Sequence, residues 1–235
     1  LSHFQIKTPL VSYHEHNKAE SGPRILQRLL SGESCALVTD AGTPAISDPG
    51  QELVNLAAEA GIPVTSIPGP CAAVTALSLS GLECRRFSFE GFLPRDKKER
   101  RASLEQARLY QGALVYYEAP HRIKETLSEL LNALGNRPVL VARELTKLHE
   151  ELWRGSLSGA VQWMQSQESR GEYVLVIGGP APAQPEEITP EQAAEIARKK
   201  MAEGCSPSEA AKLTAKETGL SKNEIYALLI QNKEE

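Results

Sequence analysis

The sequence lacks the features that mark several common classes of protein. Its four cysteines include no CxxC pair, so neither a zinc site, nor any other metal site, nor a disulfide framework is indicated. No apolar run approaches the length of a membrane span and no signal peptide is recognisable, which together favour a reduced, cytoplasmic setting. The net charge of -4 also lacks the basic excess typical of a protein that grips nucleic acid over its whole surface.

Two phosphate-binding signatures are missing as well. Neither GxGxxG nor GxxxxGK[ST] occurs, so the loops that usually hold dinucleotides and nucleoside triphosphates are not indicated. The amino-acid composition is that of an ordinary globular protein, with 41% hydrophobic and 24% charged residues over a length of 235. That length suffices for two modest domains with real cores.

Two short apolar runs, Ala36 to Val38 and Val64 to Ile67, each precede a loop rich in Gly, Pro and small residues. The runs are too short for helices and too continuous for half-exposed strands, so we expect strands buried on both faces of a parallel sheet. The loops would then lie at strand carboxyl ends, where open α/β sheets bind ligands. The plainer alternative is a pair of tight strand-to-helix turns without a ligand, but their length and proline content favour a binding loop.

Beyond Arg86 the hydrophobic periodicity changes and a second domain is predicted. Strands are expected at 87–92, 113–118, 139–143 and 173–177, helices at 98–110, 121–134 and 158–167, and a strand or hairpin within 144–153. A Pro-rich linker and three short helices, 189–203, 206–218 and 221–231, follow; their spacing fits either a helix-turn-helix or a plain three-helix bundle. The expected divisions are therefore 1–85, 86–178, 179–188 and 189–235.

Five motifs in a fixed order carry a family resemblance: DAGTPAISDPG, PGPCAAVTALSLSGL, FEGFLPR, YYEAPHR and VARELTKLHEE. They resemble the RsmI-type ribosomal RNA methyltransferases of the tetrapyrrole (corrin/porphyrin) methylase superfamily, over residues 12–178. The resemblance implies a two-domain α/β fold, with a parallel sheet in the N-terminal domain and a mixed sheet in the second, beside the small helical C-terminal unit. The family begins with a further strand and a PTPIGNLxDxTxRA loop, so we expect this chain to lack the first strand of that sheet.

The resemblance also implies the chemistry. Such proteins transfer a methyl group from S-adenosylmethionine to the ribose 2′-hydroxyl of a cytidine in the decoding region of 16S ribosomal RNA, and superfamily members are usually homodimers. The expected substrate is the small subunit or an assembly intermediate of it. Two other classes stay open: a methyltransferase acting on a tetrapyrrole or another small molecule, and a non-catalytic RNA-binding or assembly factor.

Cofactor binding is expected in a cleft between the first two domains, against the two N-terminal loops and the ends of second-domain strands. The residues expected to line it are Asp40, Ala41, Gly42, Thr43, Pro44, Ser47, Asp48, Pro68, Gly69, Cys71, Ala72, Ala73, Tyr117, Ala119 and Ile177.

Methyl transfer from a sulfonium needs alignment and a base for the hydroxyl proton. We expect that base among Glu118, His121 and Lys147, the last only if burial or nearby cations lower its pKa. Glu118 could equally cap the helix that Pro120 opens, and His121 could be a plain exposed residue.

A basic run beside the expected cleft predicts phosphate contacts, although a solvated helix start would look the same. Guanidinium groups stay protonated, so the arginines of the motifs are assigned to phosphate as well. The expected RNA-binding residues are Arg95, Lys97, Lys98, Arg100, Arg101, Arg122 and Arg143.

Overall fold

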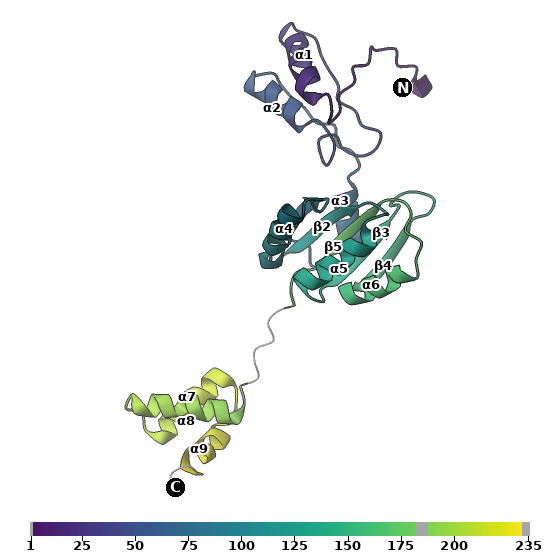
Figure 1. Cartoon of the computed structure of the whole chain (residues 1–235). Helices are drawn as coiled ribbons and strands as arrows, with labels where there is room; N and C mark the ends of the chain where they lie inside the picture. Colours follow the sequence, from purple (N-terminus) through teal and green to yellow (C-terminus); the bar gives the residue numbers. More distant parts are fainter. Residues whose placement is uncertain (1, 182–187, 232–235) are drawn as a thin grey trace. The chain divides into compact units, whose positions relative to one another are not determined.

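The computed structural model describes residues 2–181 and 188–231 and divides into two compact units, one up to Pro180 and one from Ala181 (Figure 1). Residues 182–187, which belong to the expected linker 179–188, lie outside the described residues. No helix in the described ranges is long and apolar enough to cross a membrane.

A five-stranded mixed sheet forms the centre of the first unit. Its strands are β1 (Phe87–Gly91), β2 (Ala113–Glu118), β3 (Pro138–Arg143), β4 (Glu151–Ser156) and β5 (Tyr173–Ile177), in the spatial order β1-β2-β5-β3-β4. Only the β1–β2 pair is parallel; β5 runs antiparallel to both β2 and β3, and β4 antiparallel to β3. The predicted mixed sheet is thus confirmed, and four of its strands lie within one residue of their predicted positions.

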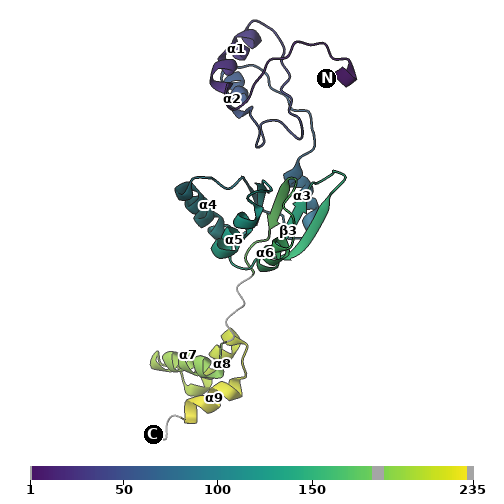
Figure 2. The ribbon, with the colours of Figure 1, turned by 45° about the vertical axis from the view of Figure 1, so that its right-hand side comes forward.

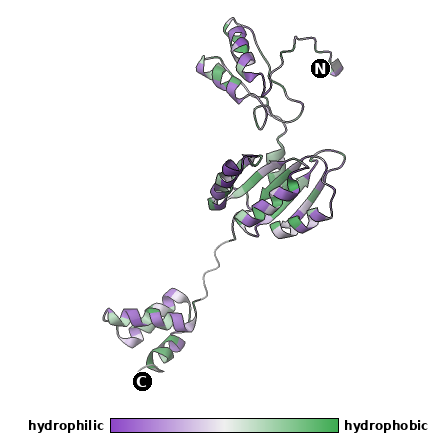
Figure 3. Ribbon diagram, in the orientation of Figure 1, coloured by the Kyte–Doolittle hydropathy of each residue, from purple (hydrophilic) through white to green (hydrophobic). Residues whose placement is uncertain are grey.

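Helices cover both faces of this sheet (Figure 2). On one face α4 (Lys97–Leu109), α5 (Ile123–Leu134) and α6 (Leu157–Gln165) bury residues such as Leu127 and Met164 against Leu114, Val141 and Leu175. On the other, α3 (Ala72–Ser80) packs Ala73, Ala76 and Leu77 against the alternate residues of the same strands. Because side chains alternate along a strand, a strand that is apolar on both faces needs cover on both, and the central strands of the sheet are accordingly largely green in Figure 3.

The N-terminal part of this unit departs from expectation. It contains a 3-10 turn (Ser2–Phe4) and two helices packed together, α1 (Lys18–Leu30) and α2 (Gln51–Glu59). The strands predicted at Ala36–Val38 and Val64–Ile67, and hence a parallel sheet there, are not formed within the described residues, and Val38 and Ile67 are 64% and 85% exposed. An extended segment becomes a strand only when a neighbour pairs with its N–H and C=O groups, and these two runs have no such partner among the described residues.

The second unit consists of three helices around a small apolar core. They are α7 (Pro190–Ala202), α8 (Pro207–Thr218) and α9 (Lys222–Gln231), close to the predicted bounds. The Thr189 and Ser206 hydroxyls accept from Gln192 N and Glu209 N, which makes each residue the N-cap of a helix that opens with proline. The α8–α9 turn begins at Gly219, whose φ of 75° is the left-handed conformation that glycine adopts without strain.

Candidate active site

Three strands end at the same edge of the sheet. Since β1 is parallel to β2, and β2 and β3 are both antiparallel to β5, the carboxyl ends of β1, β2 and β3 meet there, beside the start of β5. Tyr117, Ala119, His121, Arg143 and Lys147 all lie at or just beyond these ends. The topology therefore brings together residues predicted for three different roles.

Ile177 is not part of this edge. The β2–β5 register pairs it with Leu114 at the start of β2, three residues and about 10 Å along the strand from Tyr117. Its side chain is also fully buried in the core. Because β5 runs opposite to β2 and presents its N-terminal end here, Ile177 lies away from the strand ends that carry Tyr117 and Ala119.

The two N-terminal loops are joined to each other. The Thr43 hydroxyl donates to the Pro70 carbonyl oxygen at 3.0 Å, and Gly42 lies beside the same carbonyl with a left-handed φ of 79°. A Cβ on Gly42 would lie 3.8 Å from the Pro70 oxygen, so that side of the loop is open backbone. The loops predicted to bind the cofactor thus form one surface.

The second loop is tied in turn to the end of β2. Ala73 N, in the first turn of α3, donates to the Tyr117 hydroxyl at 3.0 Å, and the Tyr117 ring makes edge contacts with Phe89 and Phe92 at centroid distances of 4.9 and 5.9 Å. Burial raises the pKa of Tyr117, and the neighbouring Cys71 and Asp48 raise it further. Tyr117 therefore stays protonated and holds the start of α3 beside the sheet edge.

The end of β1 meets the first loop. The β1–β2 register shifts between Phe89 and Gly91, which marks a bulge, and Gly91 has a φ of 63°. A Cβ atom placed on Gly91 would lie 3.7 Å from the Ser47 hydroxyl oxygen, so the two segments are close together. Bulges turn a strand out of its ladder, and this one brings the FEGFLPR motif up to the loop that contains Ser47 and Asp48.

Glu118 is enclosed rather than presented to a substrate. Its side chain is fully buried, its Oε1 accepts from Ala119 N at 2.8 Å and its Oε2 from the Thr126 hydroxyl at 2.6 Å. Arg122 Nε lies 3.6 Å from Oε1 and completes the group. Glu118 does not cap α5, whose N-cap is Arg122 and which has no side-chain capping hydrogen bond in the described part of the chain. A carboxylate with both oxygens bonded and no solvent contact fits a structural role, and the geometry gives it no path to a ribose hydroxyl.

Lys147 is held between two carboxylates. Its ammonium donates to Glu144 Oε1 at 2.8 Å and to Glu172 Oε2 at 2.9 Å, and these bonds raise the pKa of Lys147. A lysine acts as a base only when its pKa is lowered, so the condition set for a catalytic Lys147 is not met. His121, in the turn before α5, is exposed and its side chain forms no hydrogen bond within the described part of the chain.

The predicted RNA-binding residues fall into two groups. Three of the arginines are bound within the protein. Arg100 pairs with Glu125 and Glu129, Arg122 donates to the Leu93 carbonyl oxygen, and Arg143 pairs with Glu151. Their side chains are only 16%, 14% and 22% exposed, so their assignment to phosphate loses support. Arg95, Lys97, Lys98 and Arg101 are exposed, and of these only Arg101 forms an ion pair within the described ranges, with Glu105 at 3.0 Å.

Sequence reasoning missed the partners that decide these roles. Thr126 lies eight residues beyond Glu118 and across a turn, a spacing that no helix or strand period marks. Glu129, which pairs with Arg100 at 2.8 Å, comes from a different helix 29 residues away. Neither pairing has a signal in a single sequence.

In the described residues, no group of three or more His, Cys, Asp or Glu side chains is placed to hold a metal ion.

Comparisons with known protein families cover nearly the whole chain. The family described as Tetrapyrrole (Corrin/Porphyrin) Methylases matches residues 2–161, and the one described as RsmI C-terminal HTH domain matches residues 187–233.

Curated relatives are similar over almost the full sequence. Ribosomal RNA small subunit methyltransferase I of Halalkalibacterium halodurans is 47% identical over 234 residues, 98% of this chain and 81% of the relative. The protein of the same name from Bacillus subtilis is 44% identical over 230 residues, 95% of this chain and 78% of the relative. Among solved structures, the methyltransferase CobJ superposes with a TM-score of 0.54 at 19% identity, over 75% of this chain and 76% of CobJ, a likeness of fold alone.

Proposed function

The chain belongs to the ribosomal RNA small subunit methyltransferase I family of the tetrapyrrole methylases, and we propose that it methylates the ribose 2′-hydroxyl of a cytidine in the decoding region of 16S ribosomal RNA. Membership makes it an S-adenosylmethionine-dependent ribosomal RNA methyltransferase. The observation that carries the proposal is the meeting of the two N-terminal loops with the ends of β1 and β2, through the Thr43–Pro70 and Ala73–Tyr117 hydrogen bonds.

The decisive experiment is direct. Purified protein, S-adenosylmethionine and unmodified small subunits are incubated together, and the 16S RNA is digested and analysed by mass spectrometry for 2′-O-methylcytidine. Free 16S RNA and a tetrapyrrole are the parallel substrates. Methyl transfer to the tetrapyrrole but not to RNA would overturn the proposal, and so would cofactor binding without transfer to any substrate.

S-adenosylmethionine would be held by Asp40–Pro44, Ser47, Asp48, Pro68–Ala73, Tyr117 and Ala119. The left-handed Gly42, which leaves the joined loop surface without a side chain, supports this fit. When bound, the cofactor supplies a methyl group on a sulfonium. The chain's own task is to hold that group and the ribose oxygen in line, which removes much of the barrier.

This placement is tested with a matched pair of glycine variants. Gly42→Val should abolish cofactor binding in titration calorimetry by filling the loop surface. Gly61→Val is the control, since Gly61 has a similar φ of 70° with open space around it, so the backbone strain is the same and only the site differs. Equal cofactor affinity in both variants would remove Gly42 from the site.

For the hydroxyl proton we propose His121. Of the three candidates it is the one with an exposed side chain that forms no hydrogen bond in the described ranges, while Glu118 and Lys147 are bound to partners. Imidazole is the side chain used most often as a base near neutral pH. An exposed ring in the turn before α5 could receive the proton as the oxygen attacks and pass it to water.

The exposed basic residues at the start of α4, Arg95, Lys97, Lys98 and Arg101, would contact RNA phosphates. Replacing all four by serine should raise KM for small subunits, lower the slope of log KM against log salt by close to one per lost contact, and leave cofactor affinity unchanged. Identical salt slopes in wild type and the four-site variant would mean that these basic residues do not contact RNA and are only the solvated start of a helix.

Three broader features complete the proposal. The protein would act as a homodimer, because the outer edges of β1 and β4 have no strand partner among the described residues and association would cover them. A single-chain mass in light scattering at micromolar concentration would contradict this.

The protein would work in the cytoplasm, on the small subunit or an assembly intermediate of it. Its domains would divide at 85–86 and 178–179, with a helical unit beginning at residue 189.

A further inference from the structure

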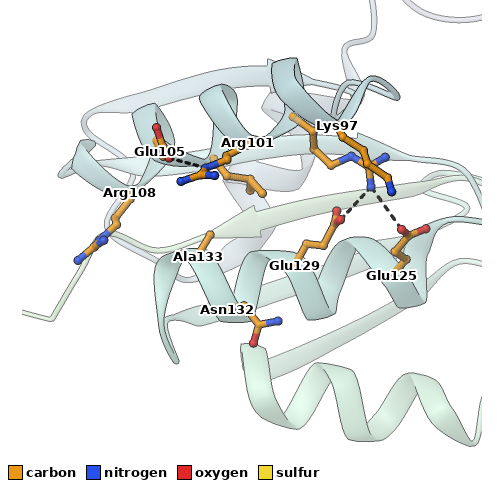
Figure 4. Close-up of a pocket in the computed structure, with 10 residues that line it drawn as sticks. Lys97, Arg101, Glu105, Arg108, Glu125, Glu129, Asn132 and Ala133 are labelled. Carbon is orange, nitrogen blue, oxygen red and sulfur yellow. Dashed lines mark hydrogen bonds and ion pairs between the residues drawn. The ribbon is translucent and has the colours of Figure 1, made fainter.

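A groove of about 470 Å³ lies between α4 and α5, on the face of the sheet opposite α3. Figure 4 shows Lys97, Arg101 and Arg108 along the α4 wall, and Glu125, Glu129, Asn132 and Ala133 along the α5 wall. The sequence motifs give no hint of it, since its two walls are separated by β2. Of its lining residues, the proposed function uses only Lys97 and Arg101.

Arg100 fixes the two walls at a set distance. Its guanidinium donates to Glu129 at 2.8 Å and Glu125 at 3.3 Å on α5, and to the carbonyl oxygens of Pro94 and Arg95 on its own side, both at 3.0 Å. The side chain is 16% exposed, and its bonds to Glu129 and the Pro94 carbonyl oxygen are partly buried, which limits competition from water. The groove is therefore a preformed feature held by a partly buried charge network.

The groove carries a small positive excess. Its four basic residues outnumber its three acidic ones by one, since Glu125 and Glu129 share the single charge of Arg100 and Glu105 pairs with Arg101 through an exposed contact of the kind that contributes little. Lys97 and Arg108 form no ion pair within the described ranges, and Lys97, Arg101 and Arg108 span about 16 Å at ~1.5 Å per helical residue. Such a row suits a chain of several phosphates better than a single anion.

One end of the groove lies toward the candidate active site. Both helices begin at the sheet edge that carries Tyr117 and His121, and Arg122 donates to the Leu93 carbonyl oxygen at 2.7 Å, which ties the start of α5 to the segment before α4. Two helix N-termini at that end add positive partial charge. A strand leaving the reacting ribose would meet this end first.

We propose that this groove binds the ribose-phosphate backbone of the RNA strand next to the methylated nucleotide, with Arg101 and Arg108 on phosphates and the Asn132 amide on a ribose or phosphate oxygen. The proposal rests on the ribosomal RNA methyltransferase activity and adds to it a path for the substrate. Arg100 is a positioning residue in this arrangement, because its guanidinium is used to hold the walls.

The test uses the full chain with Arg101→Gln and Arg108→Gln combined. Both residues are exposed, and glutamine is a good helix former, so the variant should fold. We expect KM for small subunits to rise about tenfold at moderate salt, the slope of log KM against log salt to fall by roughly 1.5 for two contacts, and kcat and cofactor affinity to stay at wild-type values. Asn132→Ala should raise KM further without changing the slope, since it removes no charge.

The matched control replaces two exposed basic residues outside the groove, Lys124→Gln on α5 and Arg85→Gln, and loses the same charge. If both double variants shift KM and slope alike, the effect is general electrostatics and the groove is not the path. If neither changes KM while wild type methylates, the groove proposal fails and the activity stands. A wild type without methylation would instead reject the proposed function itself.

Discussion

Thr126→Val tests whether Glu118 is a structural residue or the catalytic base. Thr126 is 2% exposed, and its hydroxyl donates at 2.6 Å to Glu118 Oε2, in a side chain that no solvent reaches. Valine keeps the shape but removes the donor, so one oxygen of a buried carboxylate loses its bond.

The expected loss follows from that geometry. A hydrogen bond to a charged group contributes about 1.5–3 kcal/mol, so we expect the free energy of unfolding to fall by about 2 kcal/mol. At roughly 2–4 °C per kcal/mol for a unit of this size, Tm should fall by about 4–8 °C. Ser128→Ala on the same helix is the control; its hydroxyl donates to its own helix at Lys124 O, an exposed bond whose loss should shift Tm by less than about 2 °C.

Thermal unfolding by circular dichroism gives Tm, and methylation of small subunits well below Tm gives kcat. Thr126→Val and Glu118→Gln should both lower Tm while kcat stays within about threefold of wild type, because neither group touches substrate. Unchanged Tm together with a loss of kcat of about a hundredfold or more would refute the reasoning and return Glu118 to the role of base.

Three further predictions concern other parts of the first unit. His121→Asn should lower kcat by about a hundredfold with cofactor affinity unchanged in calorimetry; full activity would exclude His121 as the base. Gly112→Ala should lower the free energy of unfolding by about 1–3 kcal/mol in a thermal melt, because the new Cβ would lie 2.3 Å from the Arg86 carbonyl oxygen. An unchanged melt would mean that Gly112 does not lie so close to this oxygen. The hydrogen bond from Lys147 lowers the pKa of Glu144. The stability that this ion pair contributes is therefore present above the ordinary carboxyl range and is lost as pH falls through the lowered pKa. Amide-exchange protection of residues 144–150 should hold from pH 8 to 5 in wild type and be weaker at every pH in Lys147→Met. Loss of wild-type protection already at pH 5, or equal protection in the variant, would show that this ion pair does not hold the loop.

The sequence by itself determined most of the elements from Phe87 onward; the exception is β4 (Glu151–Ser156), which only overlaps the end of the expected segment 144–153. The apolar run of Ala113–Glu118 is a local signal that acts over a few residues. The motifs also identified the family, since five of them occur in one order.

Only the tertiary structure decided which side chains serve the site. The antiparallel direction of β5 removed Ile177 from the edge, and contacts over 25 to 29 residues in sequence bound Arg100, Arg122 and Lys147 internally. The runs at Ala36–Val38 and Val64–Ile67 have strand composition but form no strand in the described chain. The physical reason is common to all of these: composition and period act within a segment, whereas strand pairing, burial of a charge and the choice of its partner depend on groups that only the folded chain brings together.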